Sequence, residues 1–374
     1  MNKQRIAYVN FHFFDTDVTV IKELQKTFDV EWFVILRDKD EAFHQCYFEE
    51  FVKNSGIKLY IYKYTCRRRN FKFLKLLFKV LNDVRKKDVS LVYTSCSNLY
   101  LQLALYWYIH GIPIVYGIHD VLLHSSAKVS FPERLAEFML YKLGTHFFTF
   151  SKNQYKLFLS LHKKKQCYMV GMSIKNFGLS QLSLPDKKNG TRLLMFGSMY
   201  TYKGYDLLIN AYEHLFNENI QENTKLSIYG SAKGEDFEFI MKETLHKLNY
   251  DLYLDFVDNS IIKDIYSTNH FIVMPYRDAT QSGPLMIAVY YGIPVIAPDF
   301  GIFKEVLSSQ NALLYDSRSQ DGLYNALKKA ILMQNDEYNK MRHQCNLLKQ
   351  LYSEESIGNN YIQAFSNIIT SKRK

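Results

Sequence analysis

Two loops in the second half of the chain place glycine beside a cation or a hydroxyl, just before an expected helix. In the first loop, an apolar strand at residues 192–196 ends at Gly197, and Lys203 and Gly204 precede an amphipathic helix at 206–216. A glycine permits a sharp turn beside a ligand, and a lysine near a helix N-terminus adds positive charge where free N–H groups already attract anions. The pattern is typical of phosphate binding, although it also occurs in α/β proteins that bind no ligand there.

The second loop runs from residue 274 to 285 and begins a helix at Ser282-Gly283-Pro284. Proline suits a first helical turn, the serine hydroxyl can cap the helix, and the glycine lets an anion approach the N–H groups. A further strand and loop at 294–301 lead into a helix expected at 303–307. Two helix N-termini and one lysine therefore converge on one cleft, and a diphosphate is the ligand that best matches them.

The elements that position these loops alternate regularly along the chain. Short apolar runs are separated by longer amphipathic ones, which predicts an α/β fold with two doubly wound, Rossmann-like parallel sheets. The expected strands are 5–9, 30–36, 59–62, 91–94, 114–117, 146–150 and 166–170 in the first half, and 192–196, 225–229, 252–256, 271–274, 294–297 and 313–315 in the second.

A polar segment at 179–190, with Pro185 and Asn189-Gly190, is expected to link the two domains. We therefore place the first domain at residues 1–185 and the second at 186–354, with three helices at 320–334, 337–352 and 355–371 closing the chain. Ligands of such folds bind at the carboxyl ends of the strands, so the crevice between the halves is the expected site.

The second half resembles the C-terminal half of family-4 retaining glycosyltransferases, which have the GT-B fold of two facing Rossmann-like domains. The resemblance covers about residues 190–335 and is carried by the order and spacing of four elements. They are Phe196-Gly197 with Tyr202-Lys203-Gly204, Pro275-Tyr276 with Ala279-Thr280-Gln281-Ser282-Gly283, residues 292–297, and Gly301 with Glu305. It implies a nucleotide diphosphate sugar held mainly by the second domain, an acceptor held mainly by the first, and a C-terminal helix, about 355–374, packed back on the first domain.

The resemblance also implies roles for individual residues. Lys203 matches the lysine that binds the diphosphate, Glu305 a glutamate that faces the donor sugar, and His119 a histidine that approaches the transferred sugar. Each of the last two has a plainer explanation, a loop histidine for His119 and an acidic residue in a first helical turn for Glu305. The donor-binding set is Gly197, Ser198, Lys203, Gly204, Phe256, Val257, Arg277, Gln281, Ser282, Gly283 and Gly301.

Three features depart from the family pattern. Its pair of glutamates seven residues apart falls on Ala279 and Ile287, so the usual contact to the ribose hydroxyls is missing. The arginine common between the first glycine and the lysine is absent, which leaves the phosphate charge to Lys203 with Arg277. The glycine-rich loop after the first strand is replaced by residues 10–15, Asn-Phe-His-Phe-Phe-Asp.

A basic amphipathic stretch occupies residues 67–87. Lys72, Lys75 and Lys79 form one stripe on the expected helix, preceded by Arg68 in a run of three arginines, with Phe and Leu around the rest of its surface. Such a helix can bind anionic lipid, or it can be a crossover helix with a solvated basic face. We assign Arg68, Lys72, Lys75 and Lys79 to a membrane-facing surface.

The charge distribution agrees with a membrane surface. The net charge is +10, but residues 1–185 carry 27 basic and 15 acidic side chains, while the remainder carries 20 and 22. No nucleic-acid motif accompanies the basic half, so we expect no nucleic-acid partner. Five cysteines without paired spacing and no signal-peptide pattern favour a cytoplasmic protein, peripheral on the inner face of the cytoplasmic membrane.

The leading hypothesis is a metal-independent hexosyltransferase that moves a sugar, with retention, from a nucleotide diphosphate sugar to a glycan or lipid-linked acceptor in surface-glycan assembly. No metal site and no cofactor beyond the donor co-substrate are expected. The alternative is a catalytically degenerate GT-B-like subunit that binds membrane or partner proteins. A sugar-nucleotide epimerase of the same fold is a further alternative, disfavoured because the loops follow the transferase pattern.

Overall fold

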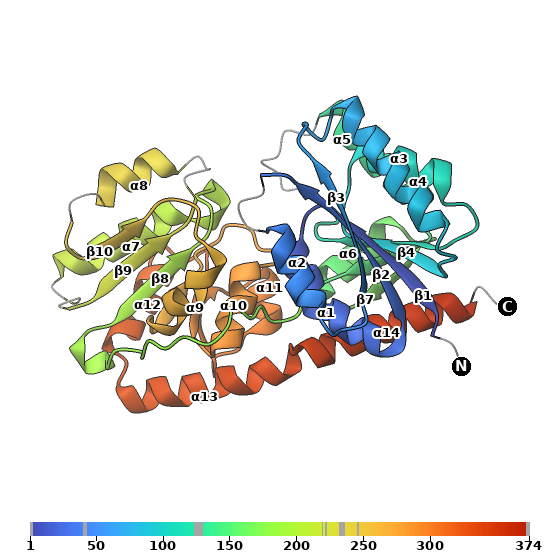
Figure 1. Cartoon of the computed structure of the whole chain (residues 1–374). Helices are drawn as coiled ribbons and strands as arrows, with labels where there is room; N and C mark the ends of the chain where they lie inside the picture. The colour runs from blue at the N-terminus through green and yellow to red at the C-terminus, as the bar shows by residue number, and fades with distance from the viewer. Residues whose placement is uncertain are drawn as a thin grey trace. The chain divides into compact units, whose positions relative to one another are not determined.

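The structure, a computed structural model, describes residues 3–39, 43–122, 130–218, 220, 223–231, 236–244 and 247–371. By its internal contacts the chain divides into two units, Met1–Ser173 with Ser353–Lys374, and Ile174–Tyr352. Each unit is built on one parallel sheet flanked by helices (Figure 1). The two doubly wound α/β sheets that the sequence predicts are therefore confirmed.

The sheet of the first unit has seven parallel strands in the order β3-β2-β1-β4-β5-β6-β7. The central strands are buried on both faces, which explains why they are apolar without alternation. The strand order reverses between β1 and β4, where the carboxyl ends open toward a ligand in folds of this kind. The strands are β1 (Arg5–Asn10), β2 (Asp29–Arg37), β3 (Lys58–Tyr64), β4 (Leu91–Thr94), β5 (Ile114–Ile118), β6 (His146–Thr149) and β7 (Gln166–Met169).

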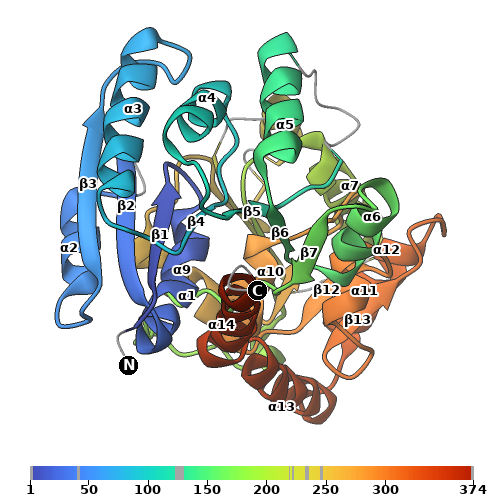
Figure 2. The same ribbon diagram turned by 90° about the vertical axis from the view of Figure 1, so that its right-hand side faces the viewer.

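Helices cover both faces of this sheet (Figure 2). On one face α4 packs between α3 and α5, and all three contribute to one apolar core. On the other face α14 packs on α1. The ring centroid of Phe365 in α14 lies 6.1 Å from that of Phe28 and 5.7 Å from that of Tyr93. The C-terminal helix therefore returns to the first unit, as expected. The helices are α1 (Phe14–Thr27), α2 (Gln45–Val52), α3 (Phe71–Arg85), α4 (Leu99–Tyr108), α5 (Phe131–Leu143), α6 (Lys152–Leu161) and α14 (Glu354–Ser371).

The second unit has a six-stranded parallel sheet in the order β10-β9-β8-β11-β12-β13. The strands are β8 (Arg192–Phe196), β9 (Lys225–Tyr229), β10 (Tyr250–Tyr253), β11 (Phe271–Val273), β12 (Val295–Pro298) and β13 (Ala312–Tyr315). The α-helices are α7 (Tyr205–Asn217), α8 (Phe237–Thr244), α9 (Asn259–Ser267), α10 (Gly283–Tyr291), α11 (Gly301–Val306), α12 (Gly322–Leu332) and α13 (Asn335–Leu351), and two 3-10 turns span Lys187–Asn189 and Thr201–Lys203. Here too the order reverses between the first strand, β8, and β11.

The boundary between the units lies earlier in the chain than residue 185. The Ile174 N–H donates to the Tyr352 carbonyl at 2.9 Å, and the Tyr291 hydroxyl donates to the Gly178 carbonyl at 2.9 Å. These bonds attach residues 174–185 to the second unit, so most of the segment expected as part of the first domain and its linker belongs to the second.

Two elements differ from the sequence-based expectation. Strand β10 ends at Tyr253, before the predicted end at residue 256, and beyond it the Asp255 carboxylate accepts a hydrogen bond from the Phe256 N–H at 2.6 Å. Helix α11 begins at Gly301, not at residue 303, and Gly301 itself has a left-handed φ of 56°. Phe256 and Glu305 therefore occupy different positions in their elements from those predicted.

Candidate functional site

The loop after β8 is shaped by two glycines. Gly197 has a φ of 129° and Gly204 a φ of 72°, values that side chains with a Cβ rarely adopt. Between them, Thr201–Lys203 forms a 3-10 turn, and Gly204 is the N-cap of α7. Ser198 is half-buried, and its carbonyl accepts from the Tyr200 N–H at 2.9 Å. The loop therefore turns back at the carboxyl edge of the sheet and directs Lys203 inward.

Lys203 is a buried cation. Its side chain is only 7% exposed, and its ammonium makes no hydrogen bond or ion pair with any residue that the structure describes. A Cβ at Gly197 would collide with this ammonium, so the charge lies directly against the backbone at the end of β8. Burial lowers the pKa of Lys203 to about 8. A buried ammonium without a counter-charge is stabilised by an anionic ligand, as the sequence predicts for this residue.

Arg277, the second cation assigned to the donor, is paired with a carboxylate. Its guanidinium forms two hydrogen bonds with the Asp206 carboxylate, at 2.7 and 2.6 Å, and a third with the Thr201 carbonyl at 2.9 Å. The Arg277 N–H also donates to the Tyr202 carbonyl at 2.7 Å. Its charge is already neutralised by Asp206, so the side chain joins two loops of the site and adds little charge to it.

The start of α10 matches the prediction. Ser282 is the N-cap, and its hydroxyl accepts from the Leu285 N–H at 3.2 Å. Gly283 and Pro284 form the first turn, while Gln281 is half-buried in the preceding loop. A nine-residue helix thus presents its N-terminal N–H groups at the same sheet edge as Lys203, where they favour an anion.

Sequence analysis missed Lys175. This lysine is 6% exposed, and its Nζ lies 3.2 Å from the position that a Cβ on Gly283 would take. It therefore brings a second buried amine to the N-terminus of α10. It stands alone in the sequence between Ile174 and Asn176, without a motif, and only the path of residues 174–178 along the second unit brings it there.

The remaining second-unit residues divide into two groups. Gly301 lies close to the loop, since a Cβ there would meet the Ala279 carbonyl, which accepts from the Ile302 N–H at 2.9 Å. Helix α11 has six residues, and the N–H of Ile302 in its first turn is bonded to Ala279, so its start offers a shorter N-terminus than that of the nine-residue α10. Val257 is buried and Phe256 half-buried beyond the end of β10, on the carboxyl edge of the sheet.

Glu305 lies in the last turn of α11, not in a first turn. It is half-buried. Burial of Tyr352 raises the pKa of that tyrosine, and the negative charge of Glu305 raises it further. The first-turn explanation for this acid is therefore wrong, because the helix begins two residues earlier than expected.

In the first unit, His119 follows β5 and lies in an aromatic setting. Its ring stacks on Phe13 with a centroid distance of 4.0 Å and lies 4.7 Å from that of Phe150. Phe13 itself has a φ of 63°, which places its ring beside the histidine. The histidine is therefore at the carboxyl edge of the sheet, as the sequence predicts, and is held by ring packing.

A cluster beside His119 was not anticipated. Burial and the charge of Arg68 lower the pKa of His12 to about 3, and its Nδ1 lies 3.0 Å from the Cys96 sulfur. Arg68 donates to the Phe11 carbonyl at 3.0 Å and to the Tyr64 hydroxyl at 2.9 Å. The assignment of Arg68 to the membrane-facing stripe is corrected, because its guanidinium binds the loop after β1. Lys72, Lys75 and Lys79 are exposed on α3, as expected.

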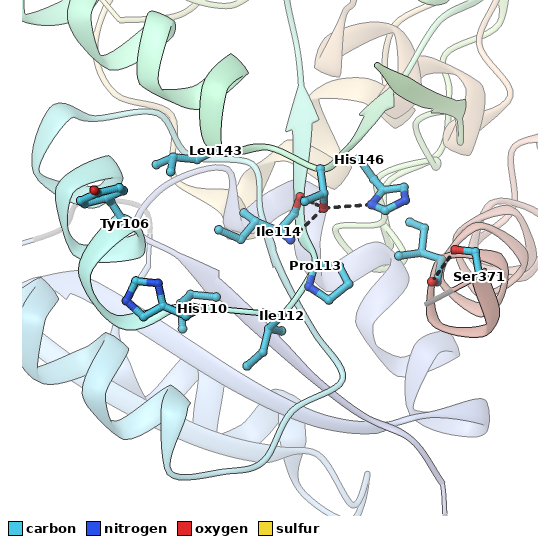
Figure 3. A pocket seen from close by; sticks show the side chains of 12 residues that line it. Tyr106, His110, Ile112, Pro113, Ile114, Leu143, His146 and Ser371 are labelled. Carbon is cyan, nitrogen blue, oxygen red and sulfur yellow. Dashed lines mark hydrogen bonds between the residues drawn. The ribbon is translucent and has the colours of Figure 1, made fainter. Parts of the chain in front are cut away.

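A cavity of about 520 Å³ lies at the opposite edge of the first sheet (Figure 3). Its lining includes Ile114 at the start of β5, His146 at the start of β6, Tyr106 of α4 and Ile368 of α14. The amino ends of the strands form it, so it is separate from the carboxyl-edge loops. Within the described ranges, no group of three His, Cys, Asp or Glu side chains is placed to hold a metal ion.

Comparisons with known proteins agree with this arrangement. The profile of the family described as glycosyl transferases group 1 matches residues 190–332. A glycogen synthase of Clostridium beijerinckii is 26% identical over 167 residues, which are 42% of this chain and 33% of the relative. The chain thus spans a third of the length of that relative.

Solved structures match over nearly the whole chain. HepE of Anabaena, in complex with UDP and glucose, superposes with a TM-score of 0.70 at 14% identity, covering 97% of this chain and 100% of that one. A sucrose-phosphate synthase of Thermosynechococcus elongatus superposes with a TM-score of 0.72 at 14% identity, covering 99% and 100%. Residues 190–332 are therefore similar to the glycosyl transferases group 1 family, and the chain shares the GT-B fold of these structures, with one Rossmann-like domain in each unit.

Proposed function

We propose that the protein is a glycosyltransferase that uses a nucleotide diphosphate sugar as donor. The observation that carries this proposal is the buried ammonium of Lys203, which has no counter-charge among the described residues and lies in the family-matched segment. The α10 N-terminus and Lys175 add positive potential at the same sheet edge. The related fold of HepE holds UDP and glucose, which makes UDP the first nucleotide to test.

The chemistry follows from the charge that develops during the reaction. When the bond between the sugar and the diphosphate breaks, negative charge accumulates on the leaving phosphate, and positive groups fixed nearby stabilise it without reorganisation. Lys203 and the N–H groups at Ser282 and Gly283 supply this stabilisation. We assign Phe256 and Val257 to the base, and His119 and Glu305 to the transferred sugar, with the acceptor attacking from the face of the leaving group so that configuration is retained.

We further propose that the acceptor is a glycan or a lipid-linked intermediate at the cytoplasmic face of the membrane, in surface-glycan assembly. The basic excess of residues 1–185, 27 basic against 15 acidic side chains, supports an anionic surface as the setting. The competing proposal is a non-catalytic subunit of the same fold, favoured by Ala279 and Ile287 at the positions of the family's glutamate pair.

Calorimetric titration of the full chain with UDP, GDP, ADP and CMP tests the donor site. We expect one of these nucleotides to bind and Lys203→Met to weaken that binding by about tenfold or more, as loss of a buried charged contact does. Lys187→Met is the matched control, because Lys187 is also buried with a lowered pKa, but donates to the Ile331 carbonyl at 2.8 Å. Absence of binding by all four nucleotides favours the non-catalytic subunit. If a nucleotide binds, turnover of the corresponding sugar donors decides between the two.

A further inference from the structure

Helix α4 of the first unit has an unusual distribution of polar and apolar residues. It contains no charged residue, and its exposed side chains are Leu103, Tyr106 and Trp107, with Trp107 65% and Tyr106 57% exposed. Their spacing of three and four residues places them on one face. The polar Gln102 is instead buried and accepts a hydrogen bond from the Tyr116 hydroxyl at 2.5 Å. An aromatic face is thus turned toward the solvent without a polar side chain other than tyrosine.

The two neighbouring helices extend this surface. Helix α5 exposes Phe131 and Phe138, together with Arg134 and Lys142. Helix α3 exposes Phe71 beside the stripe of Lys72, Lys75 and Lys79. Helix α4 packs between α3 and α5 (Figure 2), so its exposed aromatic rings lie on the helix between two that carry exposed basic residues. We call the exposed residues of these three helices the aromatic–basic face.

The three helices carry only three acidic residues, and one of them is paired with a lysine. Asp83 accepts from the Tyr62 hydroxyl at 3.0 Å and from the Lys86 ammonium at 3.2 Å. Glu133 closes the capping box at the start of α5, where it accepts from the Ser130 N–H at 2.7 Å. The other acidic residue of the three helices, Glu137, is half-buried. The surface therefore combines apolar rings with net positive charge.

This combination matches the surface of an anionic bilayer. Tryptophan and tyrosine are favoured at the level of the lipid headgroups, and lysine side chains extend along apolar surface while the ammonium reaches the phosphates. In a symmetric dimer through the same face, the lysines of two copies would oppose one another. Tyr106 also lines the cavity of Figure 3, so the apolar surface continues into a recess beside Leu143.

We propose that the aromatic–basic face binds an anionic lipid surface, with Leu103, Tyr106 and Trp107 entering the headgroup layer and Lys72, Lys75 and Lys79 contacting the phosphates. The inference rests on the proposed function only for its membrane setting, and it identifies the surface that would bring a lipid-linked acceptor to the first unit. No helix within the described residues is long and apolar enough to cross a bilayer.

The sequence provides a direct probe, since it contains two tryptophans, Trp32 and Trp107. Trp32 is fully buried and Trp107 is exposed, so acrylamide quenches the fluorescence of Trp107 selectively. We expect vesicles of phosphatidylcholine with 30% phosphatidylglycerol, at about 0.1 M salt, to shift Trp107 emission to shorter wavelength and to protect it from quenching. Phosphatidylcholine vesicles alone are expected to have little effect. Trp107→Phe removes the signal and leaves Trp32 as an internal reference.

Co-sedimentation with the same vesicles tests the charges. We expect replacement of Lys72, Lys75 and Lys79 by Gln to lower the bound fraction about tenfold or more. Replacement of Lys242, Lys304 and Lys329, three exposed lysines of the second unit, makes the same charge change and is expected to leave binding unaltered. Circular dichroism confirms that each variant is folded.

Three results would overturn the proposal. The first is no binding to anionic vesicles, and the second is binding that leaves Trp107 open to quenching by acrylamide. The third is protection of Trp107 that appears without vesicles as the protein concentration rises, which would identify a self-association surface. The nucleotide titration is performed on the same variants. Loss of lipid binding with intact nucleotide binding, or the reverse, separates failure of this inference from failure of the proposed donor site.

Discussion

The Lys203 ammonium occupies the space that a side chain at Gly197 would require. The two residues are six positions apart, and the left-handed backbone at both Gly197 and Gly204 turns the loop back so that the cation meets the end of β8. Because the Lys203 side chain is only 7% exposed, its positive charge is poorly solvated, and an anionic ligand would offset this desolvation. This pair defines the centre of the proposed phosphate site.

Replacing Lys203 by Met is expected to stabilise the ligand-free protein. The folded-state pKa is lowered to about 8, so below that pH the folded protein holds an ammonium that the unfolded chain solvates better. At about 1.4 kcal/mol per pKa unit, the gain in the free energy of unfolding is about 3 kcal/mol at pH 7. Urea unfolding measures it. A destabilised Lys203→Met protein would show instead that the lysine supports the fold.

The affinity for UDP is expected to fall as the pH rises through about 8. Nucleotide binding requires the charged form of Lys203, and the free protein loses that proton near pH 8. If bound diphosphate keeps the lysine protonated, the dissociation constant rises about tenfold between pH 7 and pH 9. Calorimetry across this range measures the trend. The residual UDP affinity of Lys203→Met should not fall with pH in this way. An equal fall in both proteins would assign the pH dependence to another titrating group.

Gly197→Ala is expected to displace Lys203 and to weaken nucleotide binding. The new Cβ would collide with the ammonium and would also occupy a backbone conformation with φ of 129° that alanine disfavours. Gly178→Ala separates the two effects, since Gly178 has a φ of 97° but its nearest neighbour is Lys263 Cδ at 3.8 Å. Both variants should lose about 1 kcal/mol of stability from the backbone. Only Gly197→Ala should lose UDP affinity.

Variants of the pair Arg277 and Asp206 distinguish a loop-joining arginine from a phosphate ligand. If Arg277 joins the loops, both Arg277→Gln and Asp206→Asn should lower the free energy of unfolding by about 1 kcal/mol and weaken UDP binding modestly. Each substitution removes the ion pair that Arg277 and Asp206 form through two hydrogen bonds. If Arg277 contacts phosphate, Asp206→Asn should strengthen UDP binding by releasing its charge. Thermal unfolding and calorimetry on the two variants decide between these outcomes.

Cys46 is expected to react first among the five thiols. It is exposed, whereas burial raises the pKa of Cys96 and Cys345 to about 12 and so suppresses their thiolate forms. Mass spectrometry after brief treatment with iodoacetamide at pH 8 identifies the alkylated residue. Rapid modification of Cys96 would contradict the packed arrangement of Cys96 and His12.

Much of the fold is determined by local patterns in the sequence. The strands are short apolar runs between amphipathic helices. Because this hydrophobic pattern is visible over a few neighbouring residues, the sequence alone predicts the two sheets and the C-terminal helices. Gly197, Lys203 and Ser282 belong to the same class of local signal. Each is recognised within one strand–loop–helix unit, because the conformation of the loop depends on residues that are adjacent in the chain.

Contacts between distant segments were decided only by the tertiary structure. Lys175 reaches Gly283 across more than a hundred residues, and Arg277 pairs with Asp206 across 71, so no local pattern records either relationship. Arg68 looks like part of a basic stripe, but its guanidinium turns to the Phe11 carbonyl. Helix α4 is uncharged and almost wholly apolar, and only packing shows which of its side chains are covered. The sequence gives the type of each side chain directly. The partners of that side chain depend on the order of the strands in the sheet, which brings distant segments together.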